Sequence, residues 1–114
     1  MRPLFHLAVP DDWVAAQATG RYERSTRGAS LADVGFVHCS WMHQVDEVAA
    51  AVFADWDGEL LLLQIDASRV GAPVREEDLA GVGERFPHVY GPLPVEAVER
   101  VRRMVRVDGA WRLQ

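Results

Sequence analysis

The segment that most constrains the fold is Glu59–Asp66, which reads ELLLLQID. Its apolar run is continuous and has the length of a strand, which is typical of a central strand covered on both faces. The chain has 114 residues, of which 49% are hydrophobic. That size and composition predict one compact domain over residues 1–114, able to bury a core without disulfides or a structural metal.

The N-terminal part predicts a strand followed by a helix. The strand is expected over Pro3–Val9, where the residues favour extended structure. Pro10 suits a first helical position, so the helix should run over Pro10–Thr19 and end at Gly20. Trp13 and Ala16 mark its buried side.

A second helix is expected after a short strand at Gly35–Cys39. Ser40 is placed to cap this helix, which should continue through Ala54. Its apolar residues recur at the spacing of a buried helical stripe: Val45, Val48, Ala49, Val52 and Phe53.

The remaining segments predict a loop and further strands. Gly20–Val34 lacks apolar periodicity and is expected to be a long, mobile loop. Pro73–Glu77 predicts a short strand, and the Asp108-Gly109 turn predicts a hairpin between Val105–Val107 and Ala110–Leu113. The predicted class is therefore α+β, with two main helices and a largely antiparallel sheet.

Composition excludes several kinds of chemistry. All twelve basic residues are arginines, so the chain cannot use a Schiff-base lysine or a P-loop lysine. Cys39 is the single cysteine, which excludes disulfides within the chain and multi-cysteine metal sites. The net charge of −5 gives no general attraction to nucleic acid, and no segment is long enough to span a membrane. We therefore expect a cytoplasmic protein.

Three histidines fall in or beside the predicted strands, namely His6, His38 and His88. Together they could line one cleft and supply acid, base or hydrogen-bond donor groups. The alternative is that each is satisfied separately by a backbone carbonyl. Their spacing matches no metal-binding motif, so no metal site is predicted.

The run His38-Cys39-Ser40, followed by Gln44, lies where a strand is expected to lead into a helix. Free N–H groups at that helix start, the Ser40 hydroxyl and the His38 ring could hold a phosphate or carboxylate. Alternatively, Ser40 acts only as the helix cap. Cys39 should point away from His38 and be buried.

Further polar candidates lie in the loop and in the segment PVREE. Tyr22 offers a stacking ring, and loop residues such as Ser30 offer a hydroxyl near arginines that could bind phosphate. Arg75 and Glu76 alternate along one strand, and Glu76 could serve as a base or contact a ribose hydroxyl. Solvated surface positions are the alternative for these residues.

The order of motifs resembles a known family. The chain combines FVHCS at 36–40, Gln44, LLLLQID at 60–66 and FPHVYGPL at 86–93. This pattern is similar to the bacterial family called domain of unknown function 952. VREE at 74–77 stands where that family usually has valine-arginine-tyrosine-glutamate, which assigns the family's glutamate to Glu77 rather than Glu76.

The resemblance implies a split-sheet fold similar to ADP-ribosyltransferases, whose active members hold NAD in a cleft. It also implies that His38 orients a ribose or phosphate and that Tyr90 stacks on a ring. With the residue patterns, it yields the candidate catalytic residues His38, Glu77 and His88. The candidate ligand-binding residues are His6, Tyr22, Ser30, Ser40, Gln44, Arg75 and Tyr90.

The leading functional hypothesis is an ADP-ribosyltransferase-like enzyme acting on NAD, as substrate, or on a related phosphorylated nucleotide. Glu77 would stabilise the oxocarbenium character that develops as the glycosidic bond breaks. Two alternatives remain open. One is a non-catalytic domain that binds a small anionic ligand or a partner protein, and the other is a biosynthetic enzyme using histidine acid-base chemistry.

Overall fold

The computed structural model describes residues 2–114, and the strand β6 (Leu60–Ile65) lies at its centre. β6 pairs antiparallel with β1 (Leu4–Ala8) on one side and with β10 (Val98–Val107) on the other. β11 (Ala110–Leu113) pairs with β10 and completes a sheet of order β1-β6-β10-β11. The prediction that this leucine-rich segment is a central strand is confirmed.

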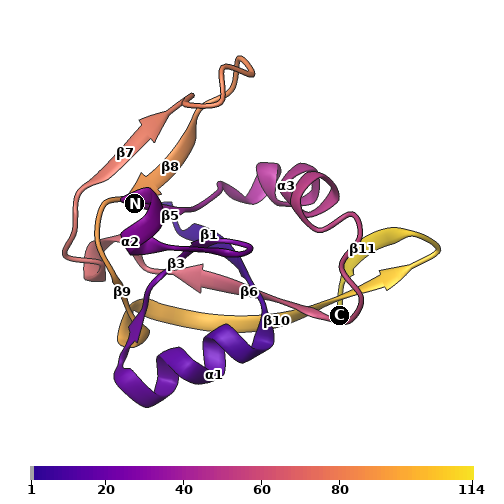
Figure 1. The fold of residues 1–114 in the computed structure, drawn as a ribbon, viewed down its shortest axis with the longest axis horizontal. Helices are drawn as coiled ribbons and strands as arrows, with labels where there is room; N and C mark the ends of the chain where they lie inside the picture. The colour runs from indigo at the N-terminus through magenta and orange to yellow at the C-terminus, as the bar shows by residue number, and fades with distance from the viewer. Residues whose placement is uncertain (1) are drawn as a thin grey trace.

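Helices cover this sheet from two sides, as the apolar run requires (Figure 1). On one face, α3 (Val45–Val52) buries Val45 and Ala49 in a core cluster that includes Leu60 and Leu62. On the other face, α1 (Pro10–Thr19) contributes Trp13 and Ala16 to a cluster with Leu63 and Ile65. Each face of β6 therefore has its own hydrophobic core.

The predicted helix α1 is confirmed, including its end. Gly20 adopts a left-handed conformation (φ 84°), and its N–H donates to the Ala16 carbonyl. This geometry favours glycine because it has no Cβ. Trp13 and Ala16 are buried, as expected.

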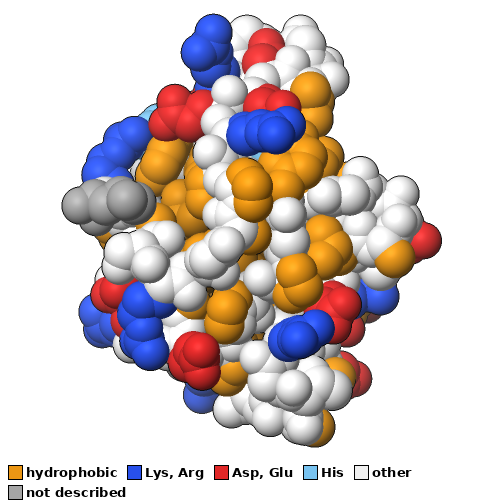
Figure 2. All heavy atoms as spheres, turned by 90° about the vertical axis from the view of Figure 1, so that its left-hand side faces the viewer, with side chains coloured by type: hydrophobic (Ala, Val, Ile, Leu, Met, Phe, Trp, Pro, Cys, Tyr) orange, Lys and Arg blue, Asp and Glu red, His pale blue; other side chains and the backbone are white. Residues whose placement is uncertain are grey.

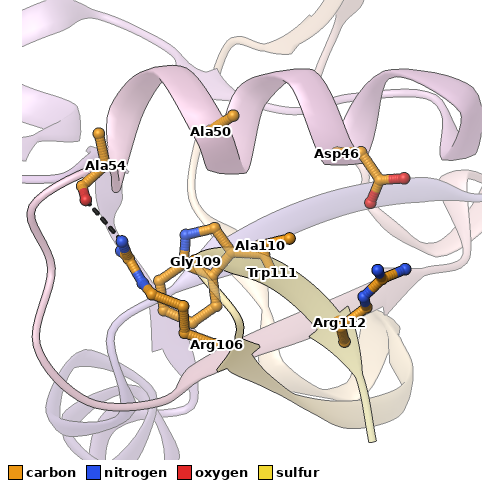
Figure 3. A pocket seen from close by; sticks show the side chains of 8 residues that line it. All are labelled: Asp46, Ala50, Ala54, Arg106, Gly109, Ala110, Trp111 and Arg112. Carbon is orange, nitrogen blue, oxygen red and sulfur yellow. Dashed lines mark hydrogen bonds between the residues drawn. The ribbon is translucent and has the colours of Figure 1, made fainter.

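The β10–β11 hairpin confirms the Asp108-Gly109 turn, at which both residues have positive φ. β10 begins at Val98, well before the predicted Val105. The Arg106 guanidinium donates to the carbonyls of Phe53, Ala54 and Trp56, just after α3. Figure 3 shows Arg106 and Trp111 at the pocket of about 390 Å³ between α3 and the hairpin, so the hairpin caps the end of this helix.

A second antiparallel sheet has the order β5-β8-β7, formed by β5 (Val37–His38), β8 (Phe86–Val89) and β7 (Val74–Glu77). It lies against the first sheet through a bridge between Phe5 and Ser40. The Phe5 N–H donates to the Ser40 carbonyl at 2.9 Å, and the Ser40 N–H donates to the Phe5 carbonyl at 2.7 Å. The strands of both sheets are antiparallel, as predicted, and the class is α+β.

The predicted long loop Gly20–Val34 is wrong. The segment contains the short strands β2 (Arg21–Tyr22), β3 (Arg24–Thr26) and β4 (Ala29–Ser30), followed by α2 (Leu31–Val34). β2 pairs with the distant strand β9 (Leu93–Pro94), and β3 pairs with β4. Strands of two or three residues are too short to show periodicity in sequence, and the partner of β2 lies far along the chain.

The start of the second helix also differs from the prediction. Ser40 forms the bridge to Phe5 instead of a cap, and a 3₁₀ turn η1 (Met42–Gln44) precedes α3. The Gln44 side chain accepts the Trp41 N–H at 2.9 Å. The predicted stripe holds, because Val45, Ala49 and Phe53 are buried and Val48 and Val52 pack beside them.

Two further 3₁₀ turns, η2 (Ala67–Arg69) and η3 (Val95–Ala97), complete the described chain. Within residues 2–114, no helix has the length and apolar character needed to cross a membrane.

Candidate functional site

One face of the β5-β8-β7 sheet gathers five of the ten candidate residues, including all three candidate catalytic residues. His38 and Arg75 both lie opposite His88 in the antiparallel register, and Glu77 lies opposite Phe86. Directly opposed residues share a face, and residues two apart on a strand also share it. We call this surface the β8 face, and it consists of Phe36, His38, Arg75, Glu77, Phe86, His88 and Tyr90.

The opposite face of the sheet belongs to the core. Val37 and Val89 are opposed and fully buried, and Cys39 is buried beside them. Burial raises the pKa of the Cys39 thiol. This confirms that Cys39 points away from His38 and is a packing residue.

Glu77 is hydrogen-bonded to two other residues of the β8 face. Its Oε1 atom accepts the Tyr90 hydroxyl at 2.5 Å and the His88 Nδ1–H at 3.1 Å. These two hydrogen bonds, the one from Tyr90 foremost, hold the pKa of Glu77 below its ordinary value, and the same bond raises the pKa of Tyr90. Oε2 makes no hydrogen bond or ion pair to any residue within 2–114. The carboxylate is therefore ionised near neutral pH, with one oxygen available to a ligand.

The His88 ring is buried and only partly satisfied. Nδ1 faces Glu77, whereas Nε2 is buried without a hydrogen-bond partner in the described chain. The Phe36 ring stacks on His88, with a centroid distance of 4.1 Å and an interplanar angle of 20°. Because a carboxylate can only accept, the proton of neutral His88 lies on Nδ1 and Nε2 carries a lone pair.

His38 and Arg75 complete the electrostatics of the β8 face. The His38 ring lies 5.1 Å from His88, and burial, assisted by the proximity of His88, lowers the pKa of His38 to about 4. His38 is therefore neutral near pH 7. The Arg75 guanidinium lies 4.7 Å from the centroid of the Tyr90 ring, in cation–π geometry. The face thus presents one anionic carboxylate and one guanidinium among aromatic rings.

Figure 2 views the molecule from the side on which β7 and β8 lie in Figure 1. Hydrophobic side chains form an exposed band there, and its upper part is bordered by arginine and acidic side chains. Aromatic surface beside paired charges is a common setting for small organic ligands.

His6 and Tyr22 do not join the β8 face. His6 donates from Nδ1 to the His38 carbonyl at 2.6 Å, and its Nε2 accepts the Tyr22 hydroxyl at 2.9 Å. Both side chains are buried, and burial lowers the pKa of His6 to about 4. This pair links β1, β2 and β5 and has a packing role.

Ser30, Ser40 and Gln44 also serve the fold. Ser30 caps α2 in a reciprocal capping box with Asp33. The anion site predicted at Ser40 is not formed, because the Ser40 N–H is bonded to Phe5 and the helix starts later. Gln44 donates to Glu84 and to the Arg85 carbonyl, so it anchors the segment before β8.

Successive side chains of β7 point to opposite faces of the sheet, which places Glu76 and Glu77 on different faces. Glu77 lies on the β8 face, whereas Glu76 points to the opposite side, 3.9 Å from Arg2. The assignment from the family resemblance is the one that fits this geometry, and the residue-based choice of Glu76 as base is not supported.

Phe36 and Phe86 belong to the β8 face but were not among the predicted site residues. Phe36 covers His88, and the Phe86 ring lies 5.2 Å from His38. Both stand two positions before a histidine, so the alternation of strand faces was a signal that could have found them. Among residues 2–114, no three His, Cys, Asp or Glu side chains are grouped as metal ligands, and we assign none.

Comparison with known proteins places the chain in a family. The model for the family described as protein of unknown function (DUF952) matches residues 7–101. The X-ray crystal structure of protein CC0527 from Caulobacter crescentus is 36% identical, with a TM-score of 0.79 over 96% of this chain and 93% of that one. The structure of a double mutant of the same protein matches equally well. No curated protein matches. The family model covers most of the chain and includes the segments that build the β8 face, so the chain belongs to the DUF952 family.

Proposed function

We propose that the β8 face binds NAD or a related phosphorylated nucleotide and that the protein is an enzyme of the ADP-ribosyltransferase-like class. The observation that carries this proposal is the state of Glu77. Its carboxylate is ionised and held in place by Tyr90 and His88, and Oε2 remains free. A fixed negative charge of this kind stabilises a positive charge that develops on a ribose ring as its bond to nicotinamide breaks.

The aromatic residues favour the same class of ligand. The nicotinamide ring of NAD is a planar cation, and such rings bind on aromatic faces near a carboxylate. Tyr90 and Phe86 supply rings beside Glu77. His38, neutral near pH 7, adds no opposing positive charge.

Arg75 supplies the group that a phosphate requires. The chain has no lysine, so any phosphate held by a side-chain cation must be held by an arginine. Arg75 lies over Tyr90 on the β8 face and is exposed. A pyrophosphate bound to Arg75 would lie beside Tyr90 and the nicotinamide ring that stacks on it.

The test is release of nicotinamide from NAD, measured by liquid chromatography. We expect the wild-type protein to release nicotinamide and Glu77→Gln to lower the rate by about 100-fold or more. Glu76→Gln is the matched control, because it makes the same change on the opposite face of the same strand. Equal rates for the two variants, or no release by the wild-type protein, would overturn the proposal.

A non-catalytic binding domain is the second candidate, and the Arg75–Tyr90 stack favours it. A guanidinium held over an aromatic ring can bind an anionic ligand without any reaction. Thermal stabilisation by NAD that depends on Arg75, with no nicotinamide released, would support this candidate over the enzyme.

A further inference from the structure

The Nε2 atom of His88 is an anomaly in this structure. The His88 side chain is 4% exposed, and Nε2 has no partner among residues 2–114. A buried polar atom without a hydrogen bond destabilises the folded state, because it has lost its contact with water and gained no partner. Such atoms are rare in folded proteins and call for a specific explanation.

The surroundings of His88 define what this nitrogen can do. Glu77 accepts the Nδ1–H, so the Nε2 lone pair is free to accept a proton. A carboxylate at Nδ1 also stabilises the imidazolium that forms when Nε2 is protonated. Glu77 can hold His88 through Oε1 and leave Oε2 for a ligand, because only Oε1 is engaged by His88 and Tyr90.

Phe36 controls the approach to this ring. It is half-buried and stacks on His88, and it follows Gly35, whose left-handed conformation (φ 98°) ends α2. Nε2 lies beneath the molecular surface and has no solvent contact, so a group reaches it only when a neighbouring side chain such as Phe36 moves. A small movement of this kind admits a water molecule or a single hydroxyl group rather than a folded macromolecule.

We propose that His88 accepts the proton of an oxygen nucleophile, a water molecule or a small alcohol, that attacks the ribose. This inference rests on the proposed function. The bond between the ribose carbon and the nicotinamide nitrogen breaks, and its electron pair leaves with nicotinamide. The nucleophile's oxygen forms the new bond to the ribose carbon, and its proton moves to His88 Nε2. The imidazolium, paired with Glu77, then loses that proton to solvent, so the products are nicotinamide, the ribosyl product and one proton.

The first test compares wild-type protein with His88→Asn, whose amide can still donate to Glu77 but has no counterpart of Nε2. We expect the kcat for nicotinamide release to fall by at least about 100-fold while NAD still stabilises the variant against heat.

Controls separate this inference from the proposed function. His43→Asn changes an exposed histidine and should leave the rate unchanged. Wild-type cleavage of NAD with an unaltered rate in His88→Asn would overturn the role of His88 alone. The absence of cleavage in wild-type protein would overturn both proposals.

A second measurement needs no variant and so does not depend on its folding. Nitrogen-15 NMR of the wild-type protein should show that the neutral His88 ring carries its proton on Nδ1 and a lone pair on Nε2. The opposite tautomer would overturn the inference.

Discussion

The Nε2 atom of His6 lies 2.9 Å from the hydroxyl oxygen of Tyr22, and both side chains are buried. Because Nδ1–H of His6 is donated to the His38 carbonyl, Nε2 can only accept, and the Tyr22 hydroxyl is its donor. Tyr22→Phe should therefore lower the free energy of unfolding by about 1–3 kcal/mol, measured by urea denaturation. Gln17→Ala, an exposed change in α1, should have little effect. A Tyr22→Phe protein as stable as wild type would contradict the role assigned to this pair.

Stability should fall under mild acid. Burial lowers the pKa values of His6 and His38 to about 4, from an ordinary value of 6.5 in the unfolded chain. Between pH 6.5 and 4 the unfolded chain binds more protons than the folded one, so the free energy of unfolding decreases as pH falls. His6 alone accounts for a loss on the order of 3 kcal/mol across that window. The urea midpoint should be lower at pH 5 than at pH 7, a range that lies above the pH at which carboxylates protonate. The His43→Gln variant should show the same decrease. Equal midpoints at the two pH values would rule out neutral, buried histidines.

The C-terminal end of α3 should depend on a side chain of β10. Arg106 donates to the carbonyls of Phe53, Ala54 and Trp56. Arg106→Ala removes these charged donors and should cost on the order of 2 kcal/mol in urea denaturation. Arg100→Ala, an exposed change on the same strand, should cost less than about 0.5 kcal/mol. Similar losses for the two variants would show that the helix end is satisfied in another way.

Gly91, next to Tyr90, lies so close to Ala72 that a larger residue should not fit there without destabilising the fold. A Cβ added at Gly91 would lie 2.8 Å from the Ala72 Cβ, which is too close for carbon atoms. Gly91→Ala should destabilise the fold by about 1–3 kcal/mol through overpacking. Adding Ala72→Gly removes the opposing atom and should restore part of the loss, which a thermal melt of the double variant would show. If the second change gives no recovery, the steric explanation is wrong.

Sequence reasoning succeeded where the signals were local. Gly20 terminates α1 through its own backbone preference, and Asp108-Gly109 sets its turn without help from distant residues. The leucines of β6 were informative because a run that is apolar on both faces needs cover on both sides. These elements could be predicted without knowledge of their partners.

It failed where a distant partner decided the outcome. Ser40 has the chemistry of a helix cap, yet its backbone pairs with Phe5, and the helix starts later. By contrast, the capping box of Ser30 and Asp33 is a local signal, although its segment was predicted to be a loop. A pairing between short strands that are far apart in the chain, such as β2 and β9, produces no recognisable pattern in the sequence of either strand.

The sequence predicted only part of the candidate site, for the same reasons. His38, His88, Arg75, Glu77 and Tyr90 meet because β7, β8 and β5 pair in one particular register. A shift of one residue would move His88 to the opposite face and break its contact with Glu77. Residue types and motifs therefore identified the candidates, whereas the register determined which of them share a surface.

The pairing of β6 also bears on how the chain is made. During synthesis, β6 emerges after β1 but before β10, which must pair with its other edge. A nascent chain that stops short of Val98 leaves a leucine-rich strand edge exposed, and such edges recruit other chains. Arg106 arrives later still, and until then the carbonyls at the end of α3 lack their donor. The full edge pairing of β6 is therefore reached only late in synthesis, once β10 has emerged.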